Sequence, residues 1–247
     1  MERTVTAIVC AHNEQEYIQG CLDSLVQQNL KPSQIIVVLD QCTDATSTII
    51  SRYSIQVIEK NVRNWKNSYA ENLELARQKA KAEYYAIVDA DVILDKDYFE
   101  KTTAKFNDKT AGISGRMITA APGALGSLMR FWEKTYHFSP FKTYLPAGCG
   151  LVVRKQFLDE IGGFQDVPAP DTYLHQKALG LGLRFAFIDE TKVYHRRKLT
   201  LRGIIKTQID YGRRRRKMSV SFWKTFLHAL FRLRPFVLYG WLRGNRH

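Results

Sequence analysis

Short apolar runs alternate with helical patterns through the first half of the chain. Four runs of five to eight residues, rich in Val and Ile, predict strands at 4–11, 34–40, 55–59 and 84–89, of which the first two read as buried. Between and after them, apolar residues recur every three or four positions, which predicts helices at 14–28, 43–53, 68–82 and 97–106. Strands that alternate with helices in this way predict a mostly parallel sheet covered on both faces.

The second half of the chain is less regular. Short strands are predicted at 113–118, 150–154, 184–188 and 192–195, and helices at 123–137, 155–161 and 172–179. Gly162 and Gly163 suit the end of the second of these helices, because glycine adopts the left-handed conformation that often closes a helix. From residue 199 onward the chain is helical, amphipathic and basic. We therefore expect a body of residues 1–198 followed by a helical tail of residues 199–247.

The charge of the chain divides at nearly the same place. The net charge of the 247 residues is +13, and the segment 196–247 carries 15 Lys or Arg and a single acid. Residues 1–195 have 22 basic and 23 acidic side chains, so the pI near 9.6 is a property of the tail. The hydrophobic fraction of 45% and the charged fraction of 25% are typical of a globular protein and exclude a disordered one.

Three further features of the sequence bear on where in the cell the protein is found. No segment offers the ~20 uncharged apolar residues that a membrane-spanning helix needs. The N-terminal apolar run, 5–11, is short and passes directly into polar residues, so we expect no signal peptide. The four cysteines show no CxxC pairing, which argues against a zinc ribbon or a redox motif and favours reduced thiols in a cytosolic protein.

Polar and acidic residues follow three of the predicted strands. The first strand leads into Ala11-His12-Asn13-Glu14, the second ends at Asp40, and the fourth leads into Asp89-Ala90-Asp91. Because ligands of such sheets bind at the carboxyl ends of the strands, we expect these residues to converge. Two carboxylates two positions apart can approach one hard cation and the ribose of a nucleotide, and Mg²⁺ typically uses one or two carboxylates plus substrate phosphates. Asp pairs are also common in solvated loops, so it is the strand-end position that favours a site.

Four ordered motifs together resemble the family 2 glycosyltransferases of the GT-A fold. The motifs are VCAHNEQEYIQGCLDSL, QIIVVLDQCTDATSTII, YYAIVDADV and AGCGLVVRKQFLDEIGGF, with the stretch 66–72 between the second and the third. In that family the first strand ends in a polar stretch closing with Asn-Glu, the second ends in an Asp within a D-x-S/C-T-D-x-T turn, and the fourth leads into a DxD. The resemblance spans residues 4–195. It implies an α/β fold with a GT-A (Rossmann-like) mixed, mostly parallel sheet flanked by helices, to which the basic amphipathic tail is added.

The resemblance also implies an inverting enzyme that uses a nucleotide-sugar donor. Residues 1–118 would form the nucleotide-sugar-binding half and residues 119–198 the acceptor half. Around the donor, the matching residues are Ala11, His12 and Glu14 at the base and ribose, Asp40 at the base, Lys66 at the diphosphate, and Asp89 with Ala90 at the ribose.

A divalent metal, Mg²⁺ or Mn²⁺, belongs to the same implied site. Asp91 would be its principal ligand, and Asp89 would be shared between the metal and the ribose. Two of the donor-side acids also have simpler explanations. Glu14 suits the N-terminus of a helix, where the dipole favours an acid, and Asp40 suits an N-cap or an Asx-turn.

The sequence offers two candidates for the catalytic base. Inversion requires a carboxylate that takes the proton from the acceptor hydroxyl while that hydroxyl attacks the anomeric carbon. In the family this residue is an acid after the GGF segment, often within a Glu-Asp pair that opens a helix. Here the segment continues QDVPAPDTYL without such a pair, so Asp171 is the best match and Asp166 is the competitor. Asp171 also suits a helix N-cap after Pro170, and both roles can hold at once.

His195, Gly148 and Gly150 complete the predicted site. In related enzymes a histidine near the end of the KVYH segment ligates the metal or meets the diphosphate, and a neutral imidazole suits a third ligand beside Asp91. The alternative is a partly buried surface histidine next to two arginines. The two glycines permit close backbone approach, and they belong either to an acceptor-side loop or to a tight turn into the following strand.

The tail combines aromatic and basic residues in a way that suits a membrane surface. The helix predicted at 199–217 ends in RRRRK, and the apolar residues of 219–241 are interrupted by Arg232, Arg234 and Pro235. Such a segment lies in the headgroup region of an anionic membrane, so we expect a cytoplasmic protein bound peripherally to the membrane. A lipid-linked acceptor such as a polyprenyl phosphate, or a glycan, would suit that place. Alternatively, the tail packs on the body with a solvated charged face or mediates oligomerisation.

Two functions of other classes remain open on the sequence. The basic tail is also typical of a nucleic-acid-binding module, although that function leaves the acid-tipped strands unexplained. A metal-dependent nucleotidyltransferase would share the sheet and the metal acids, but the first strand leads into His12-Asn13-Glu14 without a Gly-rich loop. The sequence does not determine whether the donor is UDP-, GDP- or dTDP-linked, which sugar and acceptor are used, or the oligomeric state.

Overall fold

The computed structural model describes residues 3–138, 148–217 and 219–244 of the chain. They form two compact units, one drawn from Met1–Ile118 and Tyr144–Arg196 and the other from Thr119–Thr143 and Arg197–His247. The start of the C-terminal stretch lies close to the expected end of the body at residue 198. Residues 119–138, which the sequence analysis placed in the acceptor half, group with the C-terminal helices instead.

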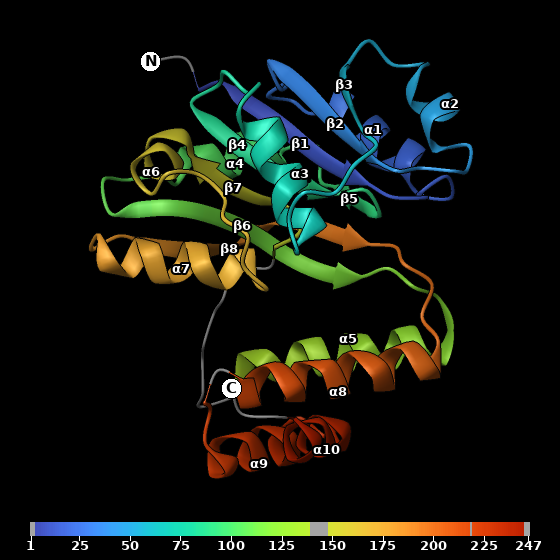
Figure 1. The fold of residues 1–247 in the computed structure, drawn as a ribbon, viewed down its shortest axis with the longest axis vertical. Helices are drawn as coiled ribbons and strands as arrows, with labels where there is room; N and C mark the ends of the chain where they lie inside the picture. Colours follow the sequence, from blue (N-terminus) through green and yellow to red (C-terminus); the bar gives the residue numbers. More distant parts are fainter. Residues whose placement is uncertain (1–2, 139–147, 218, 245–247) are drawn as a thin grey trace. The chain divides into compact units, whose positions relative to one another are not determined.

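The described residues of the first unit contain an eight-stranded mixed sheet with the order β3-β2-β1-β4-β7-β6-β8-β5 (Figure 1). β3, β2, β1 and β4 are parallel, and β7 is antiparallel to both of its neighbours, β4 and β6. This sheet confirms the predicted α/β fold. The strands are β1 (Val5–Ala11), β2 (Gln34–Asp40), β3 (Gln56–Lys60), β4 (Tyr84–Asp89), β5 (Val92–Leu94), β6 (Thr110–Thr119), β7 (Leu151–Arg154) and β8 (Arg184–His195).

Helices cover both faces of this sheet, and each face has its own apolar cluster. One cluster contains buried side chains of α1, α2 and α4, and the other contains those of α3, α6 and α7. The helices of this unit are α1 (Ile18–Val26), α2 (Thr46–Ile50), α3 (Ser68–Arg77), α4 (Tyr98–Ala104), α6 (Lys155–Glu160) and α7 (Pro170–Gly180).

Strand β1 shows why the central strands are apolar at almost every position. Val5, Ala7 and Val9 belong to the cluster of α1, whereas Ile8 belongs to the cluster of α3, and all four are fully buried. Successive side chains of a strand point to opposite faces, so a strand between two helical layers needs an apolar residue on both. The same requirement explains the Val- and Ile-rich runs of β2 and β4.

Two strands differ from the sequence prediction. Residues 184–188 and 192–195 do not form two strands but lie in a single one, β8, whose middle carries exposed residues that interrupt the apolar pattern. β5 is absent from the prediction, because three residues are too few to show a period. It pairs antiparallel with the end of β8.

Two helix starts also differ from the prediction. α2 begins at Thr46, three residues later than predicted, with Ala45 at its N-cap position, and Asp44 Oδ1 accepts the Thr46 N–H (2.9 Å). α7 begins at Pro170, which is a preferred first helical residue because its missing N–H needs no partner there. Asp171 therefore lies within the first turn of the helix, and the N-cap role predicted for it is wrong.

The second unit contains four helices among its described residues. They are α5 (Gly123–Phe138), α8 (Leu201–Lys217), α9 (Phe222–Phe231) and α10 (Pro235–Arg243). α8 and α10 approach closely at two glycines: a Cβ on Gly212 would lie 2.0 Å from the Val237 carbonyl oxygen, and one on Gly240 would lie 2.1 Å from that of Ile209. Across the described ranges, no helix combines the length and the apolar character needed to span a bilayer.

Candidate functional site

The acid-tipped strand ends lie side by side at one edge of the sheet. In the pairing of β1 with β2, Ala11 lies opposite the residue just before Asp40. In the pairing of β1 with β4, Cys10 lies opposite Asp89, which the buried Ala90 follows. The strand ends that the sequence analysis expected to converge are therefore neighbours.

The turn after β1 and the turn after β2 are joined by hydrogen bonds between residues of the Asn-Glu motif and residues of the Thr-Asp-x-Thr motif. Asn13, whose φ is +56°, accepts the N–H of Thr43 through Oδ1 (2.8 Å). The Glu14 N–H donates to Thr46 Oγ1 (2.9 Å). The Asn-Glu and Thr-Asp-x-Thr motifs thus fix the shape of this part of the sheet edge, where Glu14 is half-buried.

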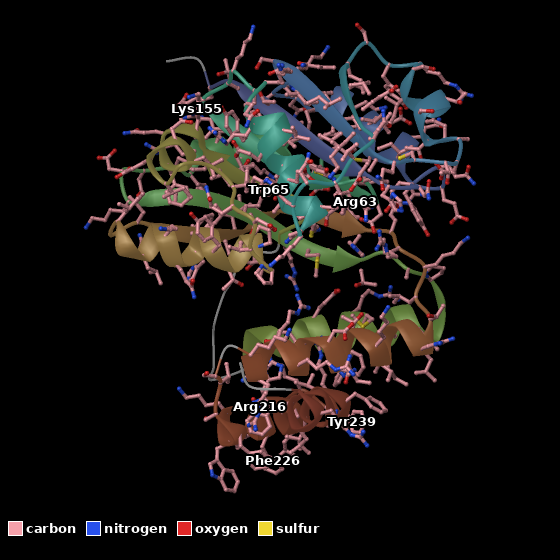
Figure 2. The ribbon with its side chains drawn as sticks, in the orientation of Figure 1. Arg63, Trp65, Lys155, Arg216, Phe226 and Tyr239 are labelled. Atoms are coloured by element: carbon pink, nitrogen blue, oxygen red, sulfur yellow. The ribbon has the colours of Figure 1, made fainter. Side chains whose placement is uncertain are left out.

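Asp40 is buried at the end of β2 and is surrounded by donors. Its carboxylate accepts hydrogen bonds from Ser68 Oγ and Asn72 Nδ2, and Arg63 Nε lies 3.3 Å from Oδ1. Arg63 belongs to the loop that leads into α3, and its guanidinium is partly exposed (Figure 2). Nδ1 of His12 lies 2.6 Å from the Asp40 carbonyl oxygen, which places the imidazole against the end of β2.

Lys60 supplies a buried positive charge to the same cluster. Its Nζ lies 3.5 Å from Asp40 Oδ2 and 3.0 Å from Glu71 Oε2, and none of the three side chains is more than 6% exposed. Burial by itself raises the pKa of both carboxyls, but hydrogen bonds and the charge of Lys60 more than offset it. The pKa of Asp40 and the pKa of Glu71 therefore lie below their ordinary values. Both acids are ionised at neutral pH and depend on Lys60 for their charge balance.

Asp91 and His195, both predicted as metal ligands, lie next to each other. The pairing of β5 with β8 sets Val92 opposite His195, and the Arg196 N–H donates to the Asp91 carbonyl (2.9 Å). As a result, His195 Nε2 lies 3.3 Å from Asp91 Oδ2. The Asp91 side chain is 3% exposed and that of His195 is 28% exposed, so the pair opens to solvent on the histidine side.

The spacing of this pair fits two adjacent positions around one cation. Ligands ~2.1 Å from an octahedral ion lie about 3 Å apart when they are adjacent, close to the separation of these two atoms. In the described part of the chain, no cluster of three or more His, Cys, Asp or Glu side chains is suited to hold a metal. A carboxylate and an imidazole would therefore need phosphate oxygens and water to complete the coordination shell, as is usual for Mg²⁺.

The first turn of α3 and the residues just before it contact other predicted positions of the site. The Tyr69 hydroxyl donates to Asp89 Oδ1 (3.2 Å). Lys66 has an exposed side chain, and its backbone N–H donates to Asp166 Oδ2 (3.0 Å). The segment around Lys66 thus lies against both the DxD motif and the acceptor-side segment.

The two candidate bases have different surroundings. Asp171 is exposed on the first turn of α7, and its carboxylate accepts the Thr172 N–H (2.8 Å). Asp166 accepts the backbone N–H groups of Lys66 (3.0 Å) and Asn67 (2.9 Å). These two hydrogen bonds hold the pKa of the Asp166 carboxyl below its ordinary value. A carboxylate engaged in this way is a poor proton acceptor, which favours Asp171 as the base.

Gly150 forms a tight turn into β7. Its φ is +75°, its carbonyl accepts the Tyr98 hydroxyl (2.5 Å), and a Cβ at this position would lie 2.7 Å from Val193. Gly148 has open space around it. Residues 139–147, which include the first residue of the AGCG motif, lie outside the described residues.

The sequence reasoning did not name several site residues of this region, among them Lys60, Arg63, Ser68, Tyr69, Glu71 and Asn72. A lysine at the end of a strand, next to a strand that ends in an acid, is a usable signal for Lys60. The contacts of Ser68 and Tyr69 depend on how the start of α3 sits over β2 and β4, and the sequence pattern does not reveal that.

Comparison of the sequence with protein-family models identifies the family to which the chain belongs. Residues 6–162, more than half of the chain, match the model of Glycosyl transferase family 2. The chain belongs to glycosyl transferase family 2. The matched segment runs from β1 to just past α6, so it contains the Asp40 cluster and the DxD motif and ends at Gly162. This family membership agrees with the resemblance seen in the motifs and gives no support to a nucleotidyltransferase or a nucleic-acid-binding module.

Known members of family 2 differ from this chain in length. Glycosyltransferase GlyA of Streptococcus pneumoniae is 33% identical over 115 residues, which are 44% of this chain and 16% of GlyA. The O-antigen chain rhamnosyltransferase WbaN of Salmonella anatum is 24% identical over 201 residues, which are 75% of this chain and 64% of WbaN. The chain therefore spans less than two thirds of the length of either relative.

A solved family structure shares the fold. The mannosyltransferase PcManGT of Pyrobaculum calidifontis, crystallised in complex with GDP-Man and Mn²⁺, superposes with a TM-score of 0.68 at 20% sequence identity. The match covers 96% of this chain and 69% of PcManGT. The coverage shows that the fold similarity extends beyond the segment matched by the family model.

Proposed function

We propose that this family 2 protein is an inverting glycosyltransferase that moves a sugar from a nucleotide-sugar donor to a hydroxyl or phosphate of an acceptor. The observation that carries the proposal is the Asp91–His195 pair, with 3.3 Å between its ligand atoms, at the sheet edge where Asp40 and Asp89 also lie. A divalent cation bound there, Mg²⁺ or Mn²⁺, stabilises the charge that builds on the departing nucleoside diphosphate.

The donor is held by residues of the segment 1–118. The turn after β1, with His12 and Glu14, and the end of β2, with Asp40, surround the base and the ribose. Asp89 contacts the ribose. The exposed ammonium of Lys66 attracts the diphosphate through charge-assisted hydrogen bonds. The relative PcManGT binds GDP-Man with Mn²⁺, which supports a donor of the same chemical class here.

Binding of nucleotide sugars in the presence of metal tests this function. UDP-, GDP- and dTDP-sugars are each added to the protein with Mn²⁺ or Mg²⁺, and thermal unfolding is measured. One nucleotide is expected to raise the Tm only when metal is present, because a ligand that binds the native state alone stabilises it by mass action. If no nucleotide sugar binds and none is turned over with any metal, the proposed function is wrong.

Asp171 is proposed as the base that deprotonates the acceptor hydroxyl. Asp171→Asn is expected to lower kcat about 10²-fold and to leave donor affinity unchanged, because general base catalysis contributes at least that much. Single-turnover kinetics with saturating donor measures the effect, and the exposed Asp108 changed to Asn serves as the matched control. Near-normal kcat in Asp171→Asn would move the base elsewhere.

The second unit is proposed to hold the enzyme at an anionic membrane surface, where a lipid-linked acceptor or a membrane-borne glycan is found. Figure 2 shows Phe226 and Tyr239 on α9 and α10, on either side of the turn between these helices. Large apolar side chains are exposed along this hairpin: Trp223, Leu230, Phe231, Leu233, Phe236, Tyr239 and Leu242. Exposed cations accompany them at Arg213, Arg214, Lys217, Lys224 and Arg243. Each cation near an anionic surface contributes about 1 kcal/mol to binding.

Liposome binding tests the membrane proposal. At low salt, the protein is expected to sediment with vesicles containing phosphatidylserine and to stay in the supernatant with phosphatidylcholine vesicles. Replacing Trp223, Phe231 and Leu233 together by Ser should abolish sedimentation. The control changes three exposed valines of the first unit, Val26, Val57 and Val62, to Ser and should have no effect. Equal sedimentation of both variants would contradict the assignment of this surface.

A further inference from the structure

Four consecutive residues at the N-terminus of α3, Lys66–Tyr69, connect three parts of the proposed site: the acceptor-side segment, the end of β2 and the DxD motif. The backbone of Lys66 bonds to Asp166 in the acceptor-side segment. The Ser68 hydroxyl donates to Asp40 at the end of β2 and accepts from Lys60 (2.6 Å). We call this stretch the hub turn.

The other two residues extend the hub turn to the helix and to the DxD motif. Asn67 caps α3, with its Oδ1 accepting the N–H groups of Tyr69 (3.1 Å) and Ala70 (3.2 Å). The Tyr69 hydroxyl then reaches Asp89 Oδ1 (3.2 Å). The position of Asp89, next to the metal ligand Asp91, is thus tied to the first turn of α3.

Asp166 and its neighbour fix the hub turn from the acceptor side. Both oxygens of the Asp166 carboxylate accept backbone N–H groups, from Lys66 and Asn67, and the Asn67 side-chain amide donates to the Val167 carbonyl (2.6 Å). The contact joins residues about a hundred positions apart, so local structure alone does not hold the turn. Hydrogen bonds to a charged acceptor are roughly twice as strong as neutral ones.

We propose that Asp166 is a positioning residue, which holds the hub turn so that Tyr69 and Ser68 orient Asp89 and Asp40 for the metal and the nucleotide. The proposal rests on the function proposed above and adds a role for a residue that does not itself touch the substrate. Through Asp166, the acceptor-side segment helps to fix the position of residues in the donor site. Asp166 itself takes no part in the transfer of the proton or the sugar.

Hydrogen exchange and Mn²⁺ binding test this role without reference to turnover. In Asp166→Ala the amides of Lys66 and Asn67 lose their acceptor, so the peptide covering 62–70 is expected to exchange faster. Electron paramagnetic resonance titration of Mn²⁺ alone, and then with UDP or GDP, should show affinity lowered about 10-fold, a typical size for coupling between adjacent groups. The kcat at saturating donor should stay within about 3-fold of wild type, and its pH profile should not move.

Two further variants separate this role from its alternatives. Tyr69→Phe removes the hydroxyl that reaches Asp89, and its effect on Mn²⁺ affinity should not add to that of Asp166→Ala, because both act through the same turn. Asp159→Ala serves as the matched control, since this acid of α6 also pairs with a residue of α3, Arg77, and with Lys155 of its own helix.

Each alternative has a distinct result. A fall in kcat at saturating donor with unchanged affinity would make Asp166 the base, and a lowered Tm with unchanged affinity would make it merely structural; either overturns the proposal. If the wild-type protein binds neither nucleotide nor metal, the proposed function fails. If the wild-type protein and Asp166→Ala bind metal and nucleotide with equal affinity, only the positioning role of Asp166 is wrong.

Discussion

Asp91→Asn is expected to lower kcat/KM about 10³-fold while the fold survives, since loss of a metal's charge stabilisation costs several kcal/mol of transition-state energy. The substitution keeps the shape of the side chain but removes the charge that faces His195 Nε2 at 3.3 Å. Sugar transfer from the donor found in the thermal screen is measured over a range of Mn²⁺ concentrations. Excess Mn²⁺ should restore little activity.

The buried position of Asp91 makes a folding control necessary. Circular dichroism and the Tm of the apo variant should match wild type, because the amide replaces a carboxylate of equal size. Asp108→Asn, an exposed acid, reports the effect of losing a charge alone. Wild-type turnover in Asp91→Asn would remove Asp91 from the metal site.

Lys60→Met is expected to lower the free energy of unfolding by about 3–5 kcal/mol, the usual cost of leaving buried charges without their partner. Asp40 and Glu71 would remain buried without the ammonium that lies 3.5 Å and 3.0 Å from them. Urea unfolding at pH 7 measures the loss. Lys155→Met, which removes an exposed cation paired with Asp159, should cost less than 1 kcal/mol, as is usual for surface pairs.

The loss in Lys60→Met should depend on pH in one direction. The pKa values of Asp40 and Glu71 are lowered in the folded protein from ordinary values of 3.8 and 4.5. A group with a depressed folded pKa stabilises the fold above its unfolded pKa, and this stabilisation is lost as the pH falls through the folded value. The difference between wild type and variant should therefore be full at pH 7 and should shrink below about pH 4. A difference that stays constant down to pH 3 would contradict the charge argument.

The strands that build the donor-side edge could be predicted from the sequence because they are buried on both faces. The bounds of β2 and β4 match the prediction residue for residue, since a run such as QIIVVLD is apolar wherever a side chain meets a helical layer. Asp40 and Asp89 were then placed correctly at one edge of the sheet, at the ends of the two strands that flank β1, because parallel strands fix where their carboxyl ends lie.

The remaining parts of the site depend on contacts that leave no periodic signal. The distance between Asp91 and His195 follows from β5, whose three residues carry no recognisable pattern. The partners of Asp166 are backbone N–H groups, which every residue except proline possesses, so the sequence does not show which residues they belong to. The early start of α7 at Pro170 likewise moved Asp171 from the predicted cap into the helix.

The second unit is assembled from two stretches that leave the ribosome at different times. α5 ends at Phe138 and α10 ends at Arg243, so at ~5–20 residues per second roughly 5–20 s separate the synthesis of the two. Trp132 of α5 is buried, and Arg234 Cζ lies over its ring, 5.2 Å from the centroid, so this cover of the indole is added only when the tail has been made. A chain cut at residue 198 would leave the indole exposed permanently and is expected to aggregate even though the sheet is whole.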